Sequence, residues 1–275
     1  MSGLTVLILG GTTEARELAA ALAEPRTAPE AEPGTEPCTG PGTGPGTEPE
    51  GDSAAGMTVI NSLAGRTSSP LLPAGEVRIG GFGGSGGLTE YLRERRIGAL
   101  VDATHPFAAR ISANAAAAAA ATGVPLLVLR RPGWSAGPGD DWYRVPDLPA
   151  AAALLPSLGE RIFLTTGRQG IDAFAERDEC WFLARSVEPP QPPMPRRLEV
   201  LLDRGPFDLD GERRLLARHR IDVLVSKDSG GPGAKLVAAR ERRIPVVLID
   251  RPAPNAAART TGTVAEAADW LRRLT

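Results

Sequence analysis

The stretch TVLILGGTTEARELAAALAE, Thr5 to Glu24, decides the fold of the chain. It opens with the unbroken apolar run VLIL, which is typical of a strand covered on both faces in a parallel sheet. Gly10 and Gly11 then allow a sharp turn, and Thr12 or Thr13 can cap a helix with one apolar stripe. Because free backbone N–H groups and the helix dipole both point at such a turn, we expect it to bind a cofactor phosphate.

This turn departs from the dinucleotide-binding fingerprint G-x-G-x-x-G/A. Its order is GGTTEA, so the middle glycine is displaced and the last position is Ala15. A strand, turn and helix without any ligand would have a similar sequence. The turn therefore indicates nucleotide binding only in combination with other features of the chain.

The composition excludes several classes of protein. The chain has 275 residues, enough for one large or two ordinary α/β domains, and its formal net charge is −2. It has no basic block, which argues against a nucleic-acid or membrane partner. It shows no signal peptide and no membrane-spanning apolar run, so we expect a cytoplasmic protein. Cys38 and Cys180 have no disulfide-framework or zinc-ligand spacing, and we expect no metal site.

Lysine is nearly absent from this chain. Lys227 and Lys235 are the only lysines among 31 basic residues, so the other 29 (31 − 2) are arginines. This ratio is typical of a coding bias that replaces lysine by arginine. A lysine that remains can do what arginine cannot, such as losing a proton or acting as a compact point charge. Chance and an exposed loop position are the alternative.

The chain divides into two halves with alternating strands and helices. We expect an N-terminal Rossmann-like domain at 1–133 and a C-terminal Rossmann-like domain at 134–275, because Pro and Gly interrupt the pattern at 130–143. Residues 25–56 are rich in Gly, Pro, Thr and Glu, and we expect a disordered insertion there. Helices are expected at 88–95, 108–121, 171–177, 212–220, 234–242 and after Thr263, which forms a capping box with Glu266.

The end of the second predicted strand, 57–62, indicates which nucleotide binds. In a Rossmann unit this strand end lies beside the cofactor ribose, and an acidic residue there favours NAD. This strand instead runs into Ala64, Gly65, Arg66 and Thr67. A basic side chain with a hydroxyl neighbour suits a 2′-phosphate and hence NADPH. A surface arginine without a ligand is the alternative.

Polar turns follow several other predicted strands. Thr104 and His105 follow the strand 99–103 and are candidate cofactor contacts, although His105 could equally be a turn residue or contact the substrate. In the second half, TTGR and KDSGG follow strands at 161–166 and 222–226. Strand ends of a parallel sheet lie on one edge, so two facing edges would form a cleft. The residues expected to line it are Thr12, Arg66, His105, Arg168 and Lys227.

Seven motifs occur in the order found in one enzyme family. They are ILGGTTEAREL, SLAGRT, GGFGG followed by GL, DATHPFA followed by ISANA, LTTGR, RGPF and VSKDSGG. The chain resembles the precorrin-6A reductases of cobalamin biosynthesis, including their cobalt-precorrin-6A members, over nearly its whole length except 25–56. The resemblance implies two Rossmann-like domains with NADPH at their cleft. It also implies reduction of one double bond of a corrin-precursor tetrapyrrole to give precorrin-6B, an oxidoreductase reaction on a CH–CH group.

The resemblance also implies roles for residues near the cleft. Hydride comes from the nicotinamide, and the neighbouring macrocycle position must gain a proton from Lys227, Asp228, His105 or a bound water. We favour the Lys227–Asp228 pair. Because the substrate carries many carboxylates, basic and polar groups are expected to hold it, although any single arginine could be a salt-bridged surface residue. The predicted substrate-binding residues are Arg168, Arg185, Arg204, Ser229 and Gly230. The candidate apolar contacts are Phe82, Phe107 and Trp134.

Three other functions remain as alternatives. A short-chain reductase usually has Tyr and Lys four residues apart on a helix, but Tyr91 is followed there by Arg95 and Tyr143 by Asp147. A methyltransferase would share the glycine turn without favouring Arg66. A non-catalytic NADP-binding module differs from a reductase only in activity. The sequence leaves open whether the ring contains cobalt, which carbon receives hydride, and the oligomeric state.

Overall fold

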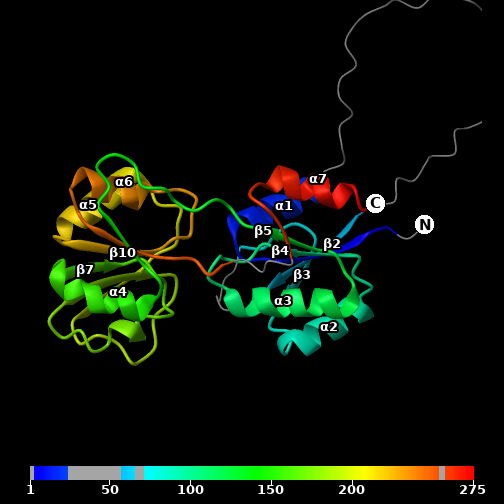
Figure 1. Cartoon of the computed structure of the whole chain (residues 1–275), viewed down its shortest axis with the longest axis horizontal. Helices are drawn as coiled ribbons and strands as arrows, with labels where there is room; N and C mark the ends of the chain where they lie inside the picture. Colours follow the sequence, from blue (N-terminus) through cyan, green and yellow to red (C-terminus); the bar gives the residue numbers. More distant parts are fainter. Residues whose placement is uncertain (1–2, 24–56, 66–70, 254–257) are drawn as a thin grey trace, which may run out of the picture.

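The computed structural model describes residues 3–23, 57–65, 71–253 and 258–275. The predicted insertion at 25–56, Arg66 and Thr67 therefore lie outside the described residues. The chain forms two lobes that lie side by side, each a sheet between helices (Figure 1). Both sheets have six strands, and every strand pair in them is parallel. The predicted α/β class with two parallel sheets is confirmed.

The first lobe is built around the opening apolar run, whose residues Val6–Leu9 are at most 2% exposed. Its sheet has the order β12-β5-β4-β1-β2-β3. The strands are β1 (Thr5–Leu9), β2 (Thr58–Leu63), β3 (Glu76–Ile79), β4 (Ala99–Asp102), β5 (Leu126–Leu129) and β12 (Arg259–Thr261). One face packs against α1 (Thr13–Ala23) and α7 (Val264–Arg272), and the other against α2 (Gly84–Glu94) and α3 (Ala109–Thr122).

The second lobe repeats this plan with the order β6-β11-β10-β7-β8-β9. Its strands are β6 (Trp142–Val145), β7 (Arg161–Leu164), β8 (Trp181–Ser186), β9 (Leu198–Leu202), β10 (Val223–Lys227) and β11 (Val246–Ile249). Helix α4 (Leu148–Leu154) and the short 3₁₀ segments η1 (Leu155–Ser157) and η2 (Asp172–Phe174) cover one face. Helices α5 (Leu209–Arg218) and α6 (Ala234–Glu241) cover the other.

The two lobes exchange their sixth strands. Read from β3 and from β9, both sheets follow the order 3-2-1-4-5-6 of the dinucleotide-binding fold. The sixth position of the first sheet is filled by β12 from the end of the chain, and that of the second sheet by β6, which directly follows the first half. Two linkers therefore run between the lobes: residues 130–141, and the segment after β11, of which residues 250–253 and 258 are described.

This exchange corrects the expectation that 134–275 forms one C-terminal domain. Helix α7 packs against α1, and its residues Ala267, Ala268, Trp270 and Leu271 belong to the first lobe's core. Its start follows the prediction, because Thr263 Oγ1 caps the helix by accepting from Glu266 N. A cap and an apolar stripe define a helix, but they do not identify the sheet on which it packs.

Other elements also differ from the predictions. The helix expected at 171–177 is only the 3₁₀ turn Asp172–Phe174, where Ile171, Ala173 and Phe174 anchor the segment in the second core. Helix α2 begins at Gly84, inside a glycine run and four residues before the expected start at 88. Position 87 of this helix requires glycine, because a Cβ there would lie 1.8 Å from the carbonyl oxygen of Phe82. Among the described residues, no helix is long and apolar enough to cross a bilayer.

Candidate active site

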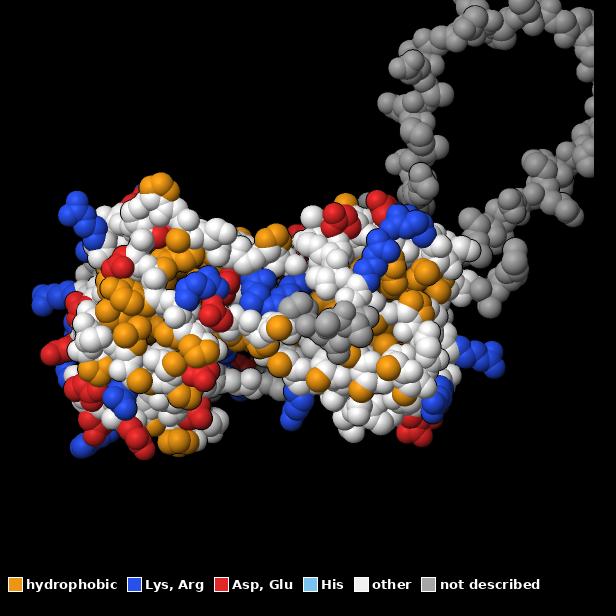
Figure 2. Space-filling model, in the orientation of Figure 1, with side chains coloured by type: hydrophobic (Ala, Val, Ile, Leu, Met, Phe, Trp, Pro, Cys, Tyr) orange, Lys and Arg blue, Asp and Glu red, His pale blue; other side chains and the backbone are white. Residues whose placement is uncertain are grey.

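The loops that follow strands of both sheets meet at the linkers between the lobes. Phe107, which follows β4 of the first lobe, packs against the core of the second lobe. Basic side chains gather at the waist between the lobes (Figure 2). The expected cleft between two facing strand edges therefore has direct support from contacts across the lobes.

The turn after β1 has the geometry of an anion-binding site. Gly10 N donates to Ser62 O at 2.9 Å, and Gly11 has φ +110°, where a Cβ would have no atom within 4 Å. Thr12 Oγ1 accepts from Ala15 N at 3.1 Å, which caps α1, and donates to Ala103 O at 2.7 Å. Thr13 is the first residue of α1. The space over Gly11 at a helix N-terminus is a cradle that fits a phosphate.

The described part of the predicted ribose-binding segment, Ala64 and Gly65, lies next to this turn. Strand β2 pairs with β1, and Gly10 is close to Leu63, so the two strand ends are neighbours. Ala64 and Gly65 are exposed just beyond β2. The structure thus brings Gly10, Gly11, Ala64 and Gly65 to one edge of the sheet.

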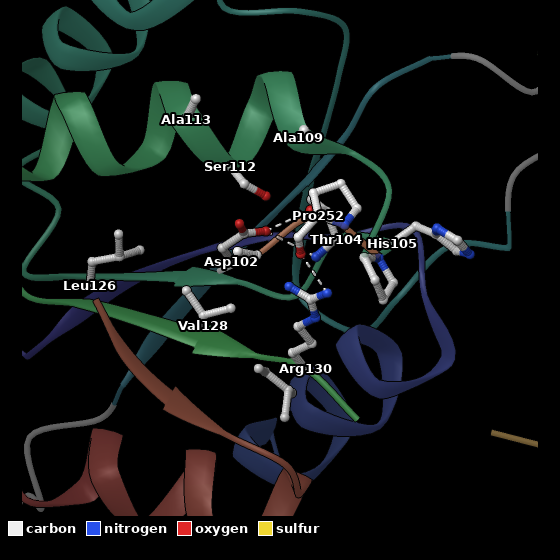
Figure 3. Close-up of a pocket in the computed structure, with 13 residues that line it drawn as sticks. Asp102, Thr104, His105, Ala109, Ser112, Ala113, Leu126, Val128, Arg130 and Pro252 are labelled. Carbon is white, nitrogen blue, oxygen red and sulfur yellow. Dashed lines mark hydrogen bonds between the residues drawn. The ribbon is translucent and has the colours of Figure 1, made fainter. Parts of the chain in front are cut away.

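A cavity of about 170 Å³ opens beside the end of β4. Asp102, which is only 3% exposed, accepts from Thr104 N at 3.1 Å and from Thr104 Oγ1 at 2.6 Å. Ser112 on α3 and Arg130 on the first linker also point toward this space (Figure 3). Because β4 pairs with β1, the cavity continues the edge that begins at Gly10.

His105 lies at the edge of the same cavity and faces several cations. Its Nδ1 accepts from Phe107 N at 3.3 Å. His105 is exposed by its surface area, but the protein around it removes part of its hydration, and this loss together with nearby positive charges lowers the pKa of His105 to about 4. These charges belong to Arg131, Lys227, Lys235 and Arg251. His105 is therefore neutral near pH 7 and serves as a hydrogen-bonding group.

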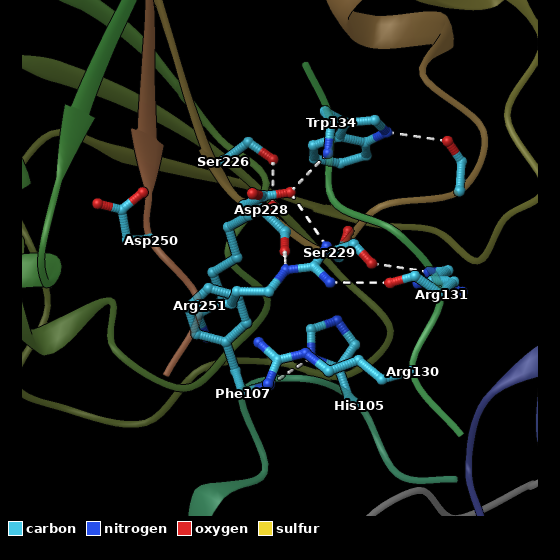
Figure 4. A network of polar contacts seen from close by, with 12 residues as sticks. His105, Phe107, Arg130, Arg131, Trp134, Ser226, Asp228, Ser229, Asp250 and Arg251 are labelled. Atoms are coloured by element: carbon cyan, nitrogen blue, oxygen red, sulfur yellow. Dashed lines mark hydrogen bonds and ion pairs between the residues drawn. The ribbon is translucent and has the colours of Figure 1, made fainter. Parts of the chain in front are cut away.

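Asp228 joins the two linkers (Figure 4). Its carboxylate accepts from Trp134 N at 3.0 Å, from Arg144 Nη2 at 2.9 Å and from Arg251 Nη2 at 3.2 Å. Burial alone would raise the pKa of Asp228, but these hydrogen bonds and the charge of Arg251 hold it below its usual value. The predicted catalytic residue Asp228 is thus an ionised anchor between the lobes, with no proton to give near neutral pH.

Arg131 connects the two strand edges. Its Nη1 donates to both carboxylate oxygens of Glu14 on α1, at 2.7 and 2.9 Å, and its Nε donates to Ser229 O at 2.7 Å. Burial raises the pKa of Glu14, but the hydrogen bond and charge of Arg131, together with hydrogen bonds from the Glu14 backbone and Thr12, hold this pKa below its usual value, so Glu14 stays ionised. Ser229, predicted to bind substrate, takes part in this bridge through its backbone carbonyl.

Gly230 has no room for a side chain. Its φ is +68°, and a Cβ would lie 2.1 Å from Pro132 O of the first linker. We expect Gly230→Ala to push the linker from Ser229 and Asp228 and to destabilise the protein by about 1–3 kcal/mol, the usual range for backbone strain. Chemical denaturation measures this loss. Gly137→Ala in the same linker region is the control, because its nearest atom, Asp140 Oδ2, would lie 3.7 Å away.

Both lysines converge on the turn after β7. Lys227 Nζ donates to Thr166 O at 2.9 Å, and Lys235 Nζ donates to Thr165 Oγ1 at 3.1 Å. Lys227 Nζ lies 5.6 Å from the ring centroid of Phe107, and Lys235 Nζ lies 5.2 Å from that of Trp134. Thr166 Oγ1 is buried and has no hydrogen-bond partner within the described part of the chain. This turn corresponds in the second sheet to the Gly10–Thr13 turn of the first.

Burial lowers the pKa of both lysine ammonium groups, those of Lys227 and Lys235. It lowers the pKa of Lys235 to about 8, with a further contribution from Arg185. Lys235 was absent from the predicted site residues. The signal that could have found it was the near absence of lysine from the chain.

The predicted substrate-binding arginines have different surroundings. Arg185 is 8% exposed, forms an ion pair with Glu212 at 2.7 Å, and lies 3.6 Å from the ring centroid of Phe207. Arg168 forms an ion pair with Glu188 at 2.6 Å. Arg204 is exposed, and its backbone N donates to Asp203. Arg185 is therefore buried and paired inside the second lobe, and its contact with the substrate stays a prediction.

The three aromatic residues predicted to contact the substrate lie in different parts of the structure. Phe107 and Trp134 lie at the cleft beside the lysines, whereas Phe82 packs in the first lobe against Arg78 and Tyr91. No group of three or more His, Cys, Asp or Glu residues that could hold a metal ion occurs among the residues described.

Comparison with known proteins gives one consistent result. The model of the family "Precorrin-6x reductase CbiJ/CobK" matches residues 50–272. The chain is 50% identical to a precorrin-6A reductase of Rhodococcus erythropolis and 44% identical to one of Mycobacterium tuberculosis, each over 98% of both chains. A solved structure of CobK precorrin-6A reductase matches with a TM-score of 0.81 and 40% identity, over 98% of this chain and 97% of that one.

Proposed function

Because this chain belongs to the precorrin-6x reductase family, we propose that it reduces precorrin-6A to precorrin-6B with NADPH in cobalamin biosynthesis. The observation that carries this proposal is the 50% identity to a precorrin-6A reductase over nearly the whole chain. The structure adds two sheets whose strand ends face each other across basic linkers. Such an arrangement can hold a nucleotide on one side and an anionic substrate on the other.

We propose that the first lobe holds NADPH. Gly10, Gly11, Thr12 and Thr13 fit the pyrophosphate, because the space over Gly11 is open and α1 begins there. Ala64 and Gly65, with Arg66 and Thr67 beyond the described residues, would hold the phosphorylated ribose. Thr104, His105 and the cavity beside Asp102 lie on the side of β1 where the nicotinamide end would follow. When bound, the cofactor supplies the hydride.

The chain's own residues position the reactants. Neutral His105 can offer one hydrogen bond at the junction of cofactor and substrate sites. The rings of Phe107 and Trp134 can contact the macrocycle and limit access of water. Cations around the waist, including Arg131, Lys227 and Lys235, make the cleft suitable for a substrate with many carboxylates. Arg168 and Arg204 stay predicted substrate contacts from the second lobe.

Both relatives and the solved structure are named for the cobalt-free substrate, so we propose cobalt-free precorrin-6A as the substrate. The test is anaerobic NADPH oxidation with precorrin-6A and with its cobalt complex in parallel. We expect stoichiometric oxidation and product formation with the cobalt-free ring. Tight NADPH binding without oxidation in either reaction would instead support a non-catalytic NADP-binding module.

Arg66 provides a test of cofactor choice. We expect Arg66→Ala to weaken NADPH binding about 10- to 100-fold and NADH binding hardly at all, since a charged hydrogen bond contributes about 1.5–3 kcal/mol. Dissociation constants from fluorescence titration measure both. Arg93→Ala, on α2, is the matched control and should leave both constants unchanged. An equal loss for the two cofactors would contradict a 2′-phosphate contact.

A further inference from the structure

We propose that Lys235 donates the proton that accompanies hydride transfer, an inference that rests on the proposed reductase function. Reduction of the double bond adds hydride to one atom and a proton to its neighbour. The hydride brings both electrons from the reduced nicotinamide. At the neighbouring ring atom, an Nζ–H bond of Lys235 breaks as the bond between that ring atom and the transferred proton forms. The neutral amine then regains a proton from water.

The distribution of basic residues is the first argument. The chain uses arginine at 29 of its 31 basic positions, and both remaining lysines direct their ammonium groups at consecutive residues of one turn. Arginine supplies charge and hydrogen bonds as well as lysine does, but it does not release a proton in proteins. A turn served by the only two lysines therefore indicates a task that needs proton release or a compact ammonium.

The position of Lys235 is the second argument. It is the second residue of α6, where the positive end of the helix dipole disfavours a cation. The charged groups that face it are Arg185 from β8, Glu212 from α5 and Arg131 from the first linker, so cations outnumber the single carboxylate. This arrangement works against the protonated form. Local electrostatic strain of this kind is expected at a functional site.

The other candidates fit the task less well. His105 is neutral near pH 7 and Asp228 is ionised with three hydrogen-bond donors, so neither carries a readily released proton. Lys227 donates to the carbonyl oxygen of Thr166. Lys235 instead donates to the hydroxyl of Thr165, which donates onward to Val225 O at 3.0 Å, and it faces the Trp134 ring. Its pKa of about 8 leaves it protonated at neutral pH yet a competent acid.

Substitution by arginine separates proton transfer from charge. We expect Lys235→Arg to lower kcat about 100-fold or more, a typical effect of losing a general acid, with little change in KM for precorrin-6A. In the wild type, kcat should fall as pH rises through about 8, because the acid form is required, and this alkaline limb should vanish in the variant. Lys227→Arg should retain the alkaline limb.

A second measurement needs no turnover. Reductive ¹³C-methylation of the apoprotein gives two lysine side-chain signals, which Lys235→Arg assigns. We expect the Lys235 signal to titrate near pH 8. An ordinary lysine pKa near 10.4, or a Lys235→Arg enzyme that keeps its kcat and its alkaline limb, overturns the proposal. Retained kcat with raised KM would show a carboxylate-binding role instead. An inactive wild type would overturn the reductase function, whereas an active wild type with active Lys235→Arg overturns only this inference.

Discussion

Removal of residues 259–275 is expected to prevent the first lobe from folding, although this segment lies at the opposite end of the chain from β1. The deletion removes β12 from its pairing with β5 and uncovers the core residues that α7 buries. The yield of soluble protein and its affinity for NADPH measure whether the first lobe still folds. Correct folding and cofactor binding of the truncated chain would show that the sixth strand is dispensable.

A single substitution in α7 tests the same contact more gently. Leu271 is fully buried, whereas Leu274, three residues later, is 39% exposed. We expect Leu271→Ala to lower the free energy of unfolding by about 2–5 kcal/mol, as is usual for a buried leucine. Leu274→Ala is the matched control and should change it by less than about 0.5 kcal/mol. Urea denaturation measures both, and similar effects for the two variants would contradict the burial of α7 in the first lobe's core.

The second large effect is expected at Asp228. Asp228→Ala leaves Arg144 and Arg251 without their shared carboxylate at the junction of the linkers, and we expect a loss of about 3–5 kcal/mol in stability. Asp250→Ala is the matched control. Asp250 also pairs with Arg144, but its side chain is 46% exposed, so its loss should cost at most about 1 kcal/mol. Comparable losses for the two variants would argue against a central role of Asp228.

The same carboxylate predicts a pH dependence. The pKa of Asp228 is lower in the folded protein than its ordinary value, so the folded state favours the ionised form. Its contribution to stability is therefore fully present above the unfolded pKa and is lost as pH falls through the folded pKa. Unfolding midpoints of the wild type and Asp228→Ala should converge in acid. A gap that stays constant down to the lowest accessible pH would contradict this assignment.

Local patterns predicted the parts of the fold that depend on local sequence. The run Val6–Leu9, the turn at Gly10 and Gly11 and the cap at Thr263 all have the expected form, because strand burial, turn freedom and capping act over a few residues. The exchange of β6 and β12 could not be predicted in this way. Strand pairing joins residues far apart in sequence, and β12 has only three residues, too few to show a periodicity.

In the candidate site, too, local sequence predicted some features, whereas others depend on contacts between residues far apart in the chain. Strand-end turns correctly indicated which loops meet, as the contacts of Phe107, Lys227 and Arg131 show. The sequence could not distinguish a free carboxylate from one bonded by three donors, so Asp228 was expected to take part in proton transfer. It also could not show that Arg185 is buried against Glu212 and Phe207. The role of Arg66 stays a prediction, since this residue lies outside the described structure.

The most direct test of the central claim is a crystal structure of this protein with NADP⁺ bound. We predict that the pyrophosphate lies on the backbone N–H groups of Gly11 and Thr12 at the start of α1, with the 2′-phosphate near Arg66 and the nicotinamide toward His105. A pyrophosphate bound at the Thr165–Thr166 turn of the second lobe, or anywhere else away from Gly11, would contradict the account.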